Sequence, residues 1–393
     1  MTQKIDSFAD ILAPTTPEEF FQDIRYQKPL HVQGAADKFA SVMSWEALTA
    51  LINQTTIWSA ATLQLVQDGR KLEPPEYCVP GANRDGAPVM VPDIEKVRGW
   101  LRQGASMVCN DIDQLSPGMK AAAGALERAL GCKVQANLYC SWKAHQGFGS
   151  HYDTHEVFAI HVAGEKTWKI YGKHFEDPIS HPYFKTFGHE FHEKHKGAIS
   201  QTVSMKPGDL LYIPRGWYHD ALATSEATIH VAFGATGPIG LDLFPMLFER
   251  AVKDPLFRTN LPAGATLADH LGQLGDRLAA YVREDEMAAQ TDAFMKGFRY
   301  SRGFITVPDD ALARTFRRNE GGIKLVRHKG AWVLTDGKQG VPIPPGLDKP
   351  IAWALDRPAF EESDLAAAFP ALKPPARAKL LQDLTNMGVL QAA

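Results

Sequence analysis

The sequence predicts a mostly β central domain, a double-sheet jelly roll or barrel, with α+β elements before it and helices after it. Residues 134–236 consist of short alternating or apolar runs, such as "VFAIHVAG" and "KTWKIYG", separated by Gly, Pro and Asp. Turn signals occur at Gly164, at Pro207 to Asp209 and at Gly216. Because no helix-length segment intervenes, these runs favour a jelly roll over a parallel α/β sheet.

Helix and strand signals alternate in the region before this core. "TPEEFFQDIRY" has a capping candidate, Thr16, before a proline, and "KPLHVQG" is typical of a short strand. "SWEALTALINQ" opens on Ser44 in the same way. The strongest helix signal covers 116–132, where Ala and Leu follow a 3.6-residue period and Gly131 marks the end. We expect residues 1–236 to form one domain with its barrel core at about 134–236.

Two further regions follow the barrel. Residues 237–308 are helical, and one apolar stripe suits packing or dimerisation: Leu267, Leu271, Leu274, Leu278 and Tyr281. Residues 309–393 combine small strands with two helical stretches, which is typical of a small winged-helix module.

Composition narrows the classes of partner and compartment. The 393 residues include 42 Lys and Arg against 45 Asp and Glu, so the net charge of −3 gives no global attraction to nucleic acid. The basic stretch around Arg314, Arg317 and Arg318 is read as a solvated surface, and no direct nucleic-acid binding is expected. The four cysteines lack CxxC spacing, and no stretch approaches the ~20 apolar residues of a membrane span. These features predict a cytoplasmic protein without a membrane partner.

The residues that indicate chemistry begin with "HYD", His151 and Asp153. Two positions apart on a strand, they point to the same face. His219, which follows a Gly-Asp turn and a Pro-Arg-Gly bend, is the best third ligand. Two histidines and one carboxylate form the facial triad of non-haem Fe(II) oxygenases, although the same set also suits zinc or manganese, or polar residues that satisfy one another.

Lys166 strengthens the oxygenase interpretation. "GEKTW" puts it on the next strand after a tight turn, and an oxygenase that uses 2-oxoglutarate needs a buried cation for the distal carboxylate. The histidine cluster "GHEFHEKHKG" does not match the HExxH zinc motif and is expected to be an exposed loop between barrel strands, near the substrate mouth.

These stretches resemble the JmjC family of Fe(II)- and 2-oxoglutarate-dependent oxygenases, which have the cupin fold, and most closely its ribosomal oxygenase branch. The likeness rests on "VQANLYCSW", "HYDTHEVFAIHVAGEKTWKIY" and "KPGDLLYIPRGWYHDA". It implies a double-stranded β-helix core, a helical dimerisation region at 237–308 and a winged helix at 309–393.

The resemblance also assigns roles to individual residues. It implies that His151, Asp153 and His219 bind Fe(II) and that Lys166 anchors 2-oxoglutarate, with O2 as the second co-substrate. Four further residues would lie beside the co-substrate or line its pocket: Asn137, Tyr139, Thr228 and His230. The residues that follow His230, Val-Ala-Phe, depart from the family pattern, which leaves the second carboxylate contact open.

The function that the resemblance implies is hydroxylation of a protein side chain, histidine or arginine, in a ribosomal protein, by a homodimeric enzyme. Two alternatives stay open at this point. The chain could hydroxylate an RNA nucleoside or a small molecule, or it could be a cupin-fold binding protein without turnover.

Overall fold

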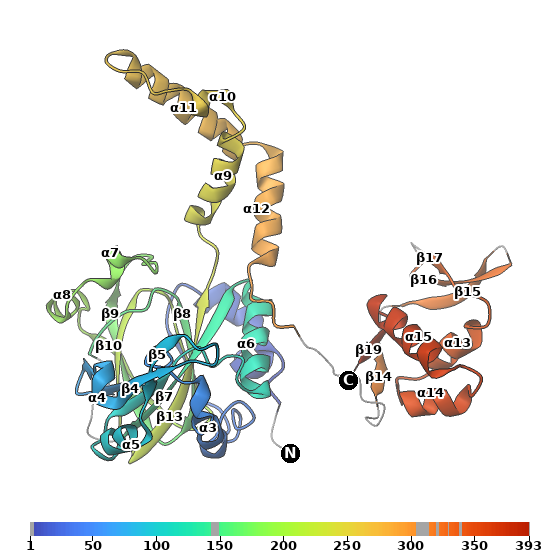
Figure 1. The fold of residues 1–393 in the computed structure, drawn as a ribbon, viewed down its shortest axis with the longest axis horizontal. Helices are drawn as coiled ribbons and strands as arrows, with labels where there is room; N and C mark the ends of the chain where they lie inside the picture. The colour runs from blue at the N-terminus through green and yellow to red at the C-terminus, as the bar shows by residue number, and fades with distance from the viewer. Residues whose placement is uncertain are drawn as a thin grey trace. The chain divides into compact units, whose positions relative to one another are not determined.

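Two antiparallel sheets face each other in the computed structural model and build the core that the sequence predicts (Figure 1). The larger sheet has the strand order β1-β11-β8-β13-β7-β6-β2-β3, and the smaller has the order β10-β9-β12. The structure describes residues 4–142, 149–303, 314–319, 322–328, 330–337 and 340–392. The strands of the larger sheet are β1 (Leu30–Val32), β2 (Leu63–Gln67), β3 (Arg70–Lys71), β6 (Ser106–Cys109), β7 (Lys133–Trp142), β8 (Glu156–Ala163), β11 (Leu210–Ile213) and β13 (Ala227–Thr236). Those of the smaller sheet are β9 (Lys166–His174), β10 (Ile199–Met205) and β12 (Trp217–Ala223).

Side chains from both sheets meet between the layers. One buried apolar cluster combines residues of β8 and β11 with residues of β9 and β10, among them Val157, Leu211, Trp168 and Val203. The chain moves repeatedly from one sheet to the other between β8 and β13, as in a jelly roll. The β-rich, cupin-like core is therefore confirmed.

The outer face of the large sheet is covered by the N-terminal elements and α6, which share its main apolar core. Their bounds are α1 (Phe8–Leu12), α2 (Pro17–Glu19), the π-helical turn η1 (Phe20–Ile24), α3 (Trp45–Ile52), the 3-10 turn η2 (Thr55–Ile57), α4 (Pro74–Tyr77), α5 (Ile94–Arg102) and α6 (Pro117–Leu130), with a separate hairpin of β4 (Cys78–Ala82) and β5 (Pro88–Pro92). The helix expected at 116–132 is confirmed: the Ser116 side chain caps its start, and Gly131 ends it with a φ of 63°.

Two short helices, α7 (Pro182–Lys185) and α8 (His189–His195), connect β9 to β10. The prediction of a loop for "GHEFHEKHKG" was therefore wrong. Gly188 is the N-cap of α8, and aromatic stacking supports the helix, since the Phe191 ring stacks on Phe187 and on His195.

A helical arm extends from the barrel after β13 (Figure 1). It comprises η3 (Gly240–Leu243), α9 (Phe244–Ala251), α10 (Pro255–Arg258), α11 (Thr266–Val282) and α12 (Asp285–Gly297). Of the expected apolar stripe, Tyr281 is buried and donates its hydroxyl to Asp254, whereas Leu271 and Leu278 are exposed. The arm returns to the barrel at Arg302, whose buried guanidinium pairs with Glu127 at 2.7 Å and with Asp113 at 2.7 Å.

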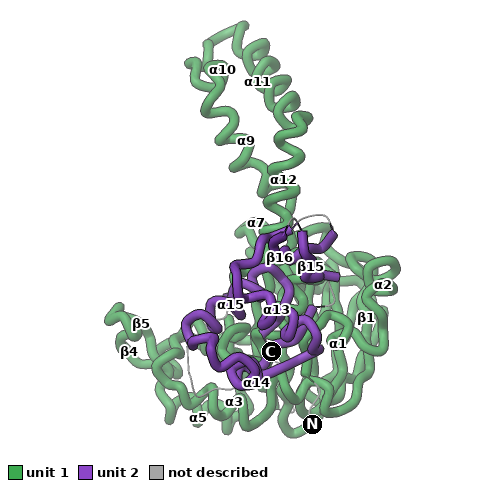
Figure 2. Tube along the Cα trace, turned by 90° about the vertical axis from the view of Figure 1, so that its right-hand side faces the viewer, with its two compact units in different colours: residues 1–302 green, residues 303–393 purple. Residues whose placement is uncertain are grey.

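The chain divides into two compact units, residues 1–302 and 303–393, so the arm belongs to the barrel unit (Figure 2). The second unit has its own apolar core and contains β14 (Thr315–Arg318), β15 (Lys324–His328), β16 (Ala331–Thr335), β17 (Gly340–Pro342), α13 (Asp348–Leu355), β18 (Ala359–Glu361), α14 (Glu362–Ala368), α15 (Pro374–Asn386) and β19 (Leu390–Ala392). No helix in the described part of the chain has the length and apolar character that crossing a bilayer requires.

The predicted turn before β11 gives a test of this fold. Gly208 has a φ of +92°, and a Cβ there would collide with the carbonyl oxygen of Ala35, whereas Gly69, with a φ of +77°, has open space around it. We expect Gly69→Ala to lower the free energy of unfolding by roughly 1–2 kcal/mol through backbone strain alone. Gly208→Ala should lower it by clearly more, because a backbone oxygen cannot move aside. Urea unfolding measures both, and equal losses would contradict the packing of this turn.

Candidate metal centre

His151 and His219 lie opposite each other across an antiparallel bridge between two backbone segments. The His151 amide donates to the His219 carbonyl at 3.1 Å, and the His219 amide donates to the His151 carbonyl at 2.9 Å. Directly opposite residues of such a pair project to the same face. The two rings consequently lie with their centroids 4.5 Å apart.

A second pair of hydrogen bonds orients the two imidazoles. Nδ1 of His151 lies 2.9 Å from the Gly149 carbonyl oxygen, and Nδ1 of His219 lies 2.9 Å from that of Trp217. A carbonyl only accepts, so each Nδ1 carries the proton, and each Nε2 keeps its lone pair for a ligand. The Nε2 of His219 lies 3.5 Å from Asp153 Oδ2.

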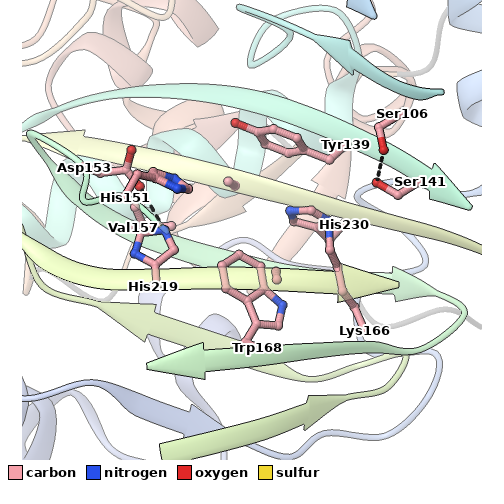
Figure 3. Close-up of a pocket in the computed structure, with 12 residues that line it drawn as sticks. Ser106, Tyr139, Ser141, His151, Asp153, Val157, Lys166, Trp168, His219 and His230 are labelled. Atoms are coloured by element: carbon pink, nitrogen blue, oxygen red, sulfur yellow. Dashed lines mark hydrogen bonds and ion pairs between the residues drawn. The ribbon is translucent and has the colours of Figure 1, made fainter. Parts of the chain in front are cut away.

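One ligand atom from each of His151, Asp153 and His219 lies within 4.8 Å of the other two, and this is the only such group of three among the described residues (Figure 3). Burial, with His151 nearby, lowers the pKa of His219 to about 4. Burial alone would raise the pKa of Asp153, but the charges of His155, His219 and His151 outweigh it and lower that pKa. At neutral pH the cluster is therefore an ionised carboxylate beside a neutral imidazole of His219, which is the protonation state that metal binding requires.

Lys166, the first residue of β9, shares a cavity of about 70 Å³ with this cluster. Here we call it the inner cavity. Figure 3 shows the ligand cluster at one end and Lys166 at the other. Lys166 is 7% exposed, and burial lowers its pKa to about 8, so it is still largely cationic at pH 7. None of the ion pairs among the described residues includes it. A buried cation of this kind calls for an anionic ligand.

The remaining predicted residues fall into two groups. Tyr139 and His230 line the inner cavity, and their rings stack with centroids 4.7 Å apart. Asn137 and Thr228 are not part of its lining. Thr228 donates to the Ser141 carbonyl. Asn137 accepts the Asp111 amide and hydrogen-bonds Tyr139, its neighbour on the same face of β7, so Asn137 supports the Tyr139 side chain from beside the cavity.

The sequence did not point to several residues that line the inner cavity. The inner cavity also contains Ser106, Ser141, Val157, Trp168, Ala221 and Ala232. Trp168 lies two positions after Lys166 on the same strand, so strand alternation was a signal for it. Ser106 comes from β6, and no local pattern pointed to it; its hydroxyl donates to Ser141 at 3.0 Å.

A larger cavity of about 640 Å³, here the outer cavity, adjoins the same cluster, since His151 and Asp153 line both. Its walls come from the α7–α8 segment, through Phe184, Lys185 and His192, and from both ends of the arm, through Ile239, Asp242 and Phe298. The metal cluster therefore opens onto a space much larger than the inner cavity.

Comparison with known proteins agrees with this geometry. Residues 116–243, which include all three candidate ligands and Lys166, match the family model of the JmjC domain. The chain is 23% identical over 349 residues to the bifunctional lysine-specific demethylase and histidyl-hydroxylase NO66 of Drosophila willistoni, covering 78% of this chain and 42% of that protein. It is 24% identical over 307 residues to ribosomal oxygenase 1 of Danio rerio, covering 74% and 52%.

The X-ray structure of E. coli ycfD shares the fold, with a TM-score of 0.50 over 96% of this chain and 98% of that one, at 16% identity. The fold and the family match together define a JmjC domain at residues 116–243 of this chain. Proteins named ribosomal oxygenase are among its relatives, so the resemblance is confirmed. The chain spans about half or less of the length of these curated relatives.

The buried neutral histidines predict how stability depends on pH. Burial lowers the pKa of His161, behind His230, to about 4, against ~6.5 in an unfolded chain. Between these values the unfolded chain binds the proton and the folded chain does not. The free energy of unfolding of the metal-free protein should be unaffected by this group above pH 6.5 and fall by up to about 3 kcal/mol as the pH drops to 4. His161→Gln should make that fall shallower in urea titrations, and His189→Gln, an exposed control, should not; identical slopes in all three proteins would contradict the assignment.

Proposed function

We propose that this protein is an Fe(II)- and 2-oxoglutarate-dependent oxygenase that hydroxylates a side chain of a ribosomal protein. The observation that carries the proposal is the pairing of two features in one small cavity: a cluster of two histidines and one carboxylate, and a buried lysine with no ion pair among the described residues. A zinc or structural site explains the cluster but supplies no anion for the buried Lys166, whose ammonium lies 5.9 Å from the centre of the Trp168 ring.

The donor set fits Fe(II). The Nε2 atoms of His151 and His219 and a carboxylate oxygen of Asp153 would hold the ion on one side and leave its other positions free. When bound, the iron supplies the activation of O2 that couples oxidative decarboxylation of 2-oxoglutarate to hydroxylation of a C–H bond. No side chain is needed as a general base in this scheme.

The inner cavity suits a small dicarboxylate. Lys166 would bind the distal carboxylate by a charge-assisted hydrogen bond, while the end of the co-substrate near the cluster meets the metal. Three ring nitrogens in this region are buried without a partner among the described residues: Nδ1 of His161, Nδ1 of His230 and Nε1 of Trp168. Trp168 and His230 line the cavity, so Nε1 of Trp168 and Nδ1 of His230 are candidates for the second carboxylate contact.

The outer cavity would admit the substrate side chain. Its volume and its composite walls favour a residue presented on a polypeptide over a free small molecule. Relatives named histidyl-hydroxylase and ribosomal oxygenase support a histidine or an arginine of a ribosomal protein as the target.

The other parts of the chain complete the proposal. We assign dimerisation to the arm, where Phe244, Phe248 and Leu271 are all more than half exposed. The second unit, whose described residues form three helices and two small sheets, is assigned as a winged-helix domain without direct nucleic-acid binding. All four cysteines of the chain lie in the barrel unit as buried free thiols, which suits a protein that acts in the reducing cytoplasm.

Turnover of the co-substrate tests the chemistry. With Fe(II) and 2-oxoglutarate, the wild type should form succinate, and His151→Ala or Asp153→Ala should abolish it because a ligand is lost. Lys166→Met should raise the KM for 2-oxoglutarate at least about tenfold by removing the charge that binds the distal carboxylate. Lys194→Ala, an exposed position of α8, serves as the control. No succinate from the wild type with any substrate would favour a cupin-fold binding protein.

Mass spectrometry tests the substrate. Ribosomal proteins of a strain with this chain should carry a modification of about +16 Da, the mass of one oxygen, that is absent from a deletion strain and from a strain with the Asp153→Ala variant. Identical ribosomal proteins in all strains, together with succinate formation in vitro, would instead favour an RNA nucleoside or a small molecule as substrate.

A further inference from the structure

A buried polar cluster lies behind the two metal-binding histidines. Ser150 precedes His151, and Asp220 follows His219. Because His151 and His219 are directly opposite in an antiparallel bridge, Ser150 and Asp220 also face each other, on the side away from the ligands. Both are less than one-tenth exposed. With Tyr171 and Lys196 they form what we call the rear cluster.

The rear cluster is continuously hydrogen-bonded. The Ser150 hydroxyl donates to Asp220 Oδ2 at 2.9 Å, and the Tyr171 hydroxyl donates to the same oxygen. The Lys196 ammonium donates to Ser150 Oγ at 3.0 Å and to the Tyr171 hydroxyl at 3.2 Å, and it lies 4.4 Å from the centre of the Tyr171 ring. Three backbone segments are thereby joined: the one before β8, β9 and β12.

Lys196 extends this network to the wall of the outer cavity. It is the C-cap of α8, and its side chain is only 16% exposed. Glu193, one turn earlier on α8, pairs with it at 2.7 Å. The same helix carries His192, which lines the outer cavity. One ammonium group therefore links α8 directly to the segment that carries His151, and to β12 through the hydroxyls of Ser150 and Tyr171.

The charges of the cluster depend on one another. Asp220 is a buried carboxylate whose nearest cation in this network is Lys196, reached through the two bridging hydroxyls. Buried charges are stable only when they are paired and hydrogen-bonded. Removing one member of such a network lowers the stability of the fold more than replacing all of its members with apolar residues does. Loss of Lys196 would thus disturb the pairing of Ser150 with Asp220, and with it the backbone of both neighbouring histidines.

We propose that Lys196 is a positioning residue that fixes His151 and His219 in the geometry of metal binding by holding Ser150, Tyr171 and Asp220 together. The inference rests on the proposed function, since it takes the histidines as ligands of a metal. Partners behind metal ligands typically change metal affinity about 10- to 100-fold when they are removed.

Co(II) binding to the metal-free full chain tests this without turnover. Visible absorption spectra report both affinity and coordination geometry. Lys196→Met keeps the apolar stem of the side chain and should raise the Kd for Co(II) at least about tenfold and alter the absorption bands. Lys196→Arg keeps the charge and donors and should restore most of the affinity. Lys194→Met, an exposed lysine on the same helix, should bind like the wild type.

The outcomes separate this inference from the proposed function. Wild-type affinity and spectrum in Lys196→Met, or an equal loss in Lys194→Met, would overturn the positioning role alone. A wild type that binds no Co(II) would overturn the metal centre and the inference with it. If Lys196→Met does not fold, Ser150→Ala decides: weaker Co(II) binding supports the role, and unchanged binding overturns it.

Discussion

The reciprocal backbone hydrogen bonds between His151 and His219 are the constraint on which the rest of the site depends. These bonds form an isolated bridge that lies before β8 in the chain. They connect the segment that leads into the large sheet with β12 of the small sheet. The two sheets of the jelly roll are thus tied at one end, and the imidazoles project where they meet. Asp153, two residues after His151, completes the cluster without any further element.

The buried polar groups of the inner cavity oppose folding, and this unfavourable free energy points to a ligand. The cavity contains a buried lysine without an ion-pair partner among the described residues, and three buried ring nitrogens in its region lack hydrogen bonds there. Burying such groups opposes folding unless a ligand satisfies them. The apolar cluster between the sheets, with Val157, Val203 and Leu211, stabilises the core that tolerates this cost. Val157 belongs both to this cluster and to the lining of the inner cavity, so the residues that stabilise the core directly adjoin those that form the site.

The sequence was informative where the physics is local. Turn glycines, the capped helix ending at Gly131 and the alternation of short runs predicted the barrel, and strand periodicity put His151 and Asp153 on one face. What could not be predicted arises from long-range packing. Ser106 enters the cavity from β6, Asp220 gains its role only through the bridge to the His151 segment, and α8 is supported by ring stacking that no local period reveals. Asn137 shows the converse, because strand alternation alone does not say whether a side chain reaches a cavity or supports its wall.

The helical arm begins and ends at the rim of the outer cavity, where Ile239 and Asp242 lie at its start and Phe298 at its end. Arg302 then fixes the returning chain to α6 through Glu127. Because the arm leaves and rejoins the barrel at one place, its far end can change in length or sequence without moving the metal ligands. Its two roots, by contrast, form part of the wall of the outer cavity, so changes there alter the shape of the cavity. The far end and the base of the arm can therefore vary independently, and only changes at the base alter the walls of the outer cavity.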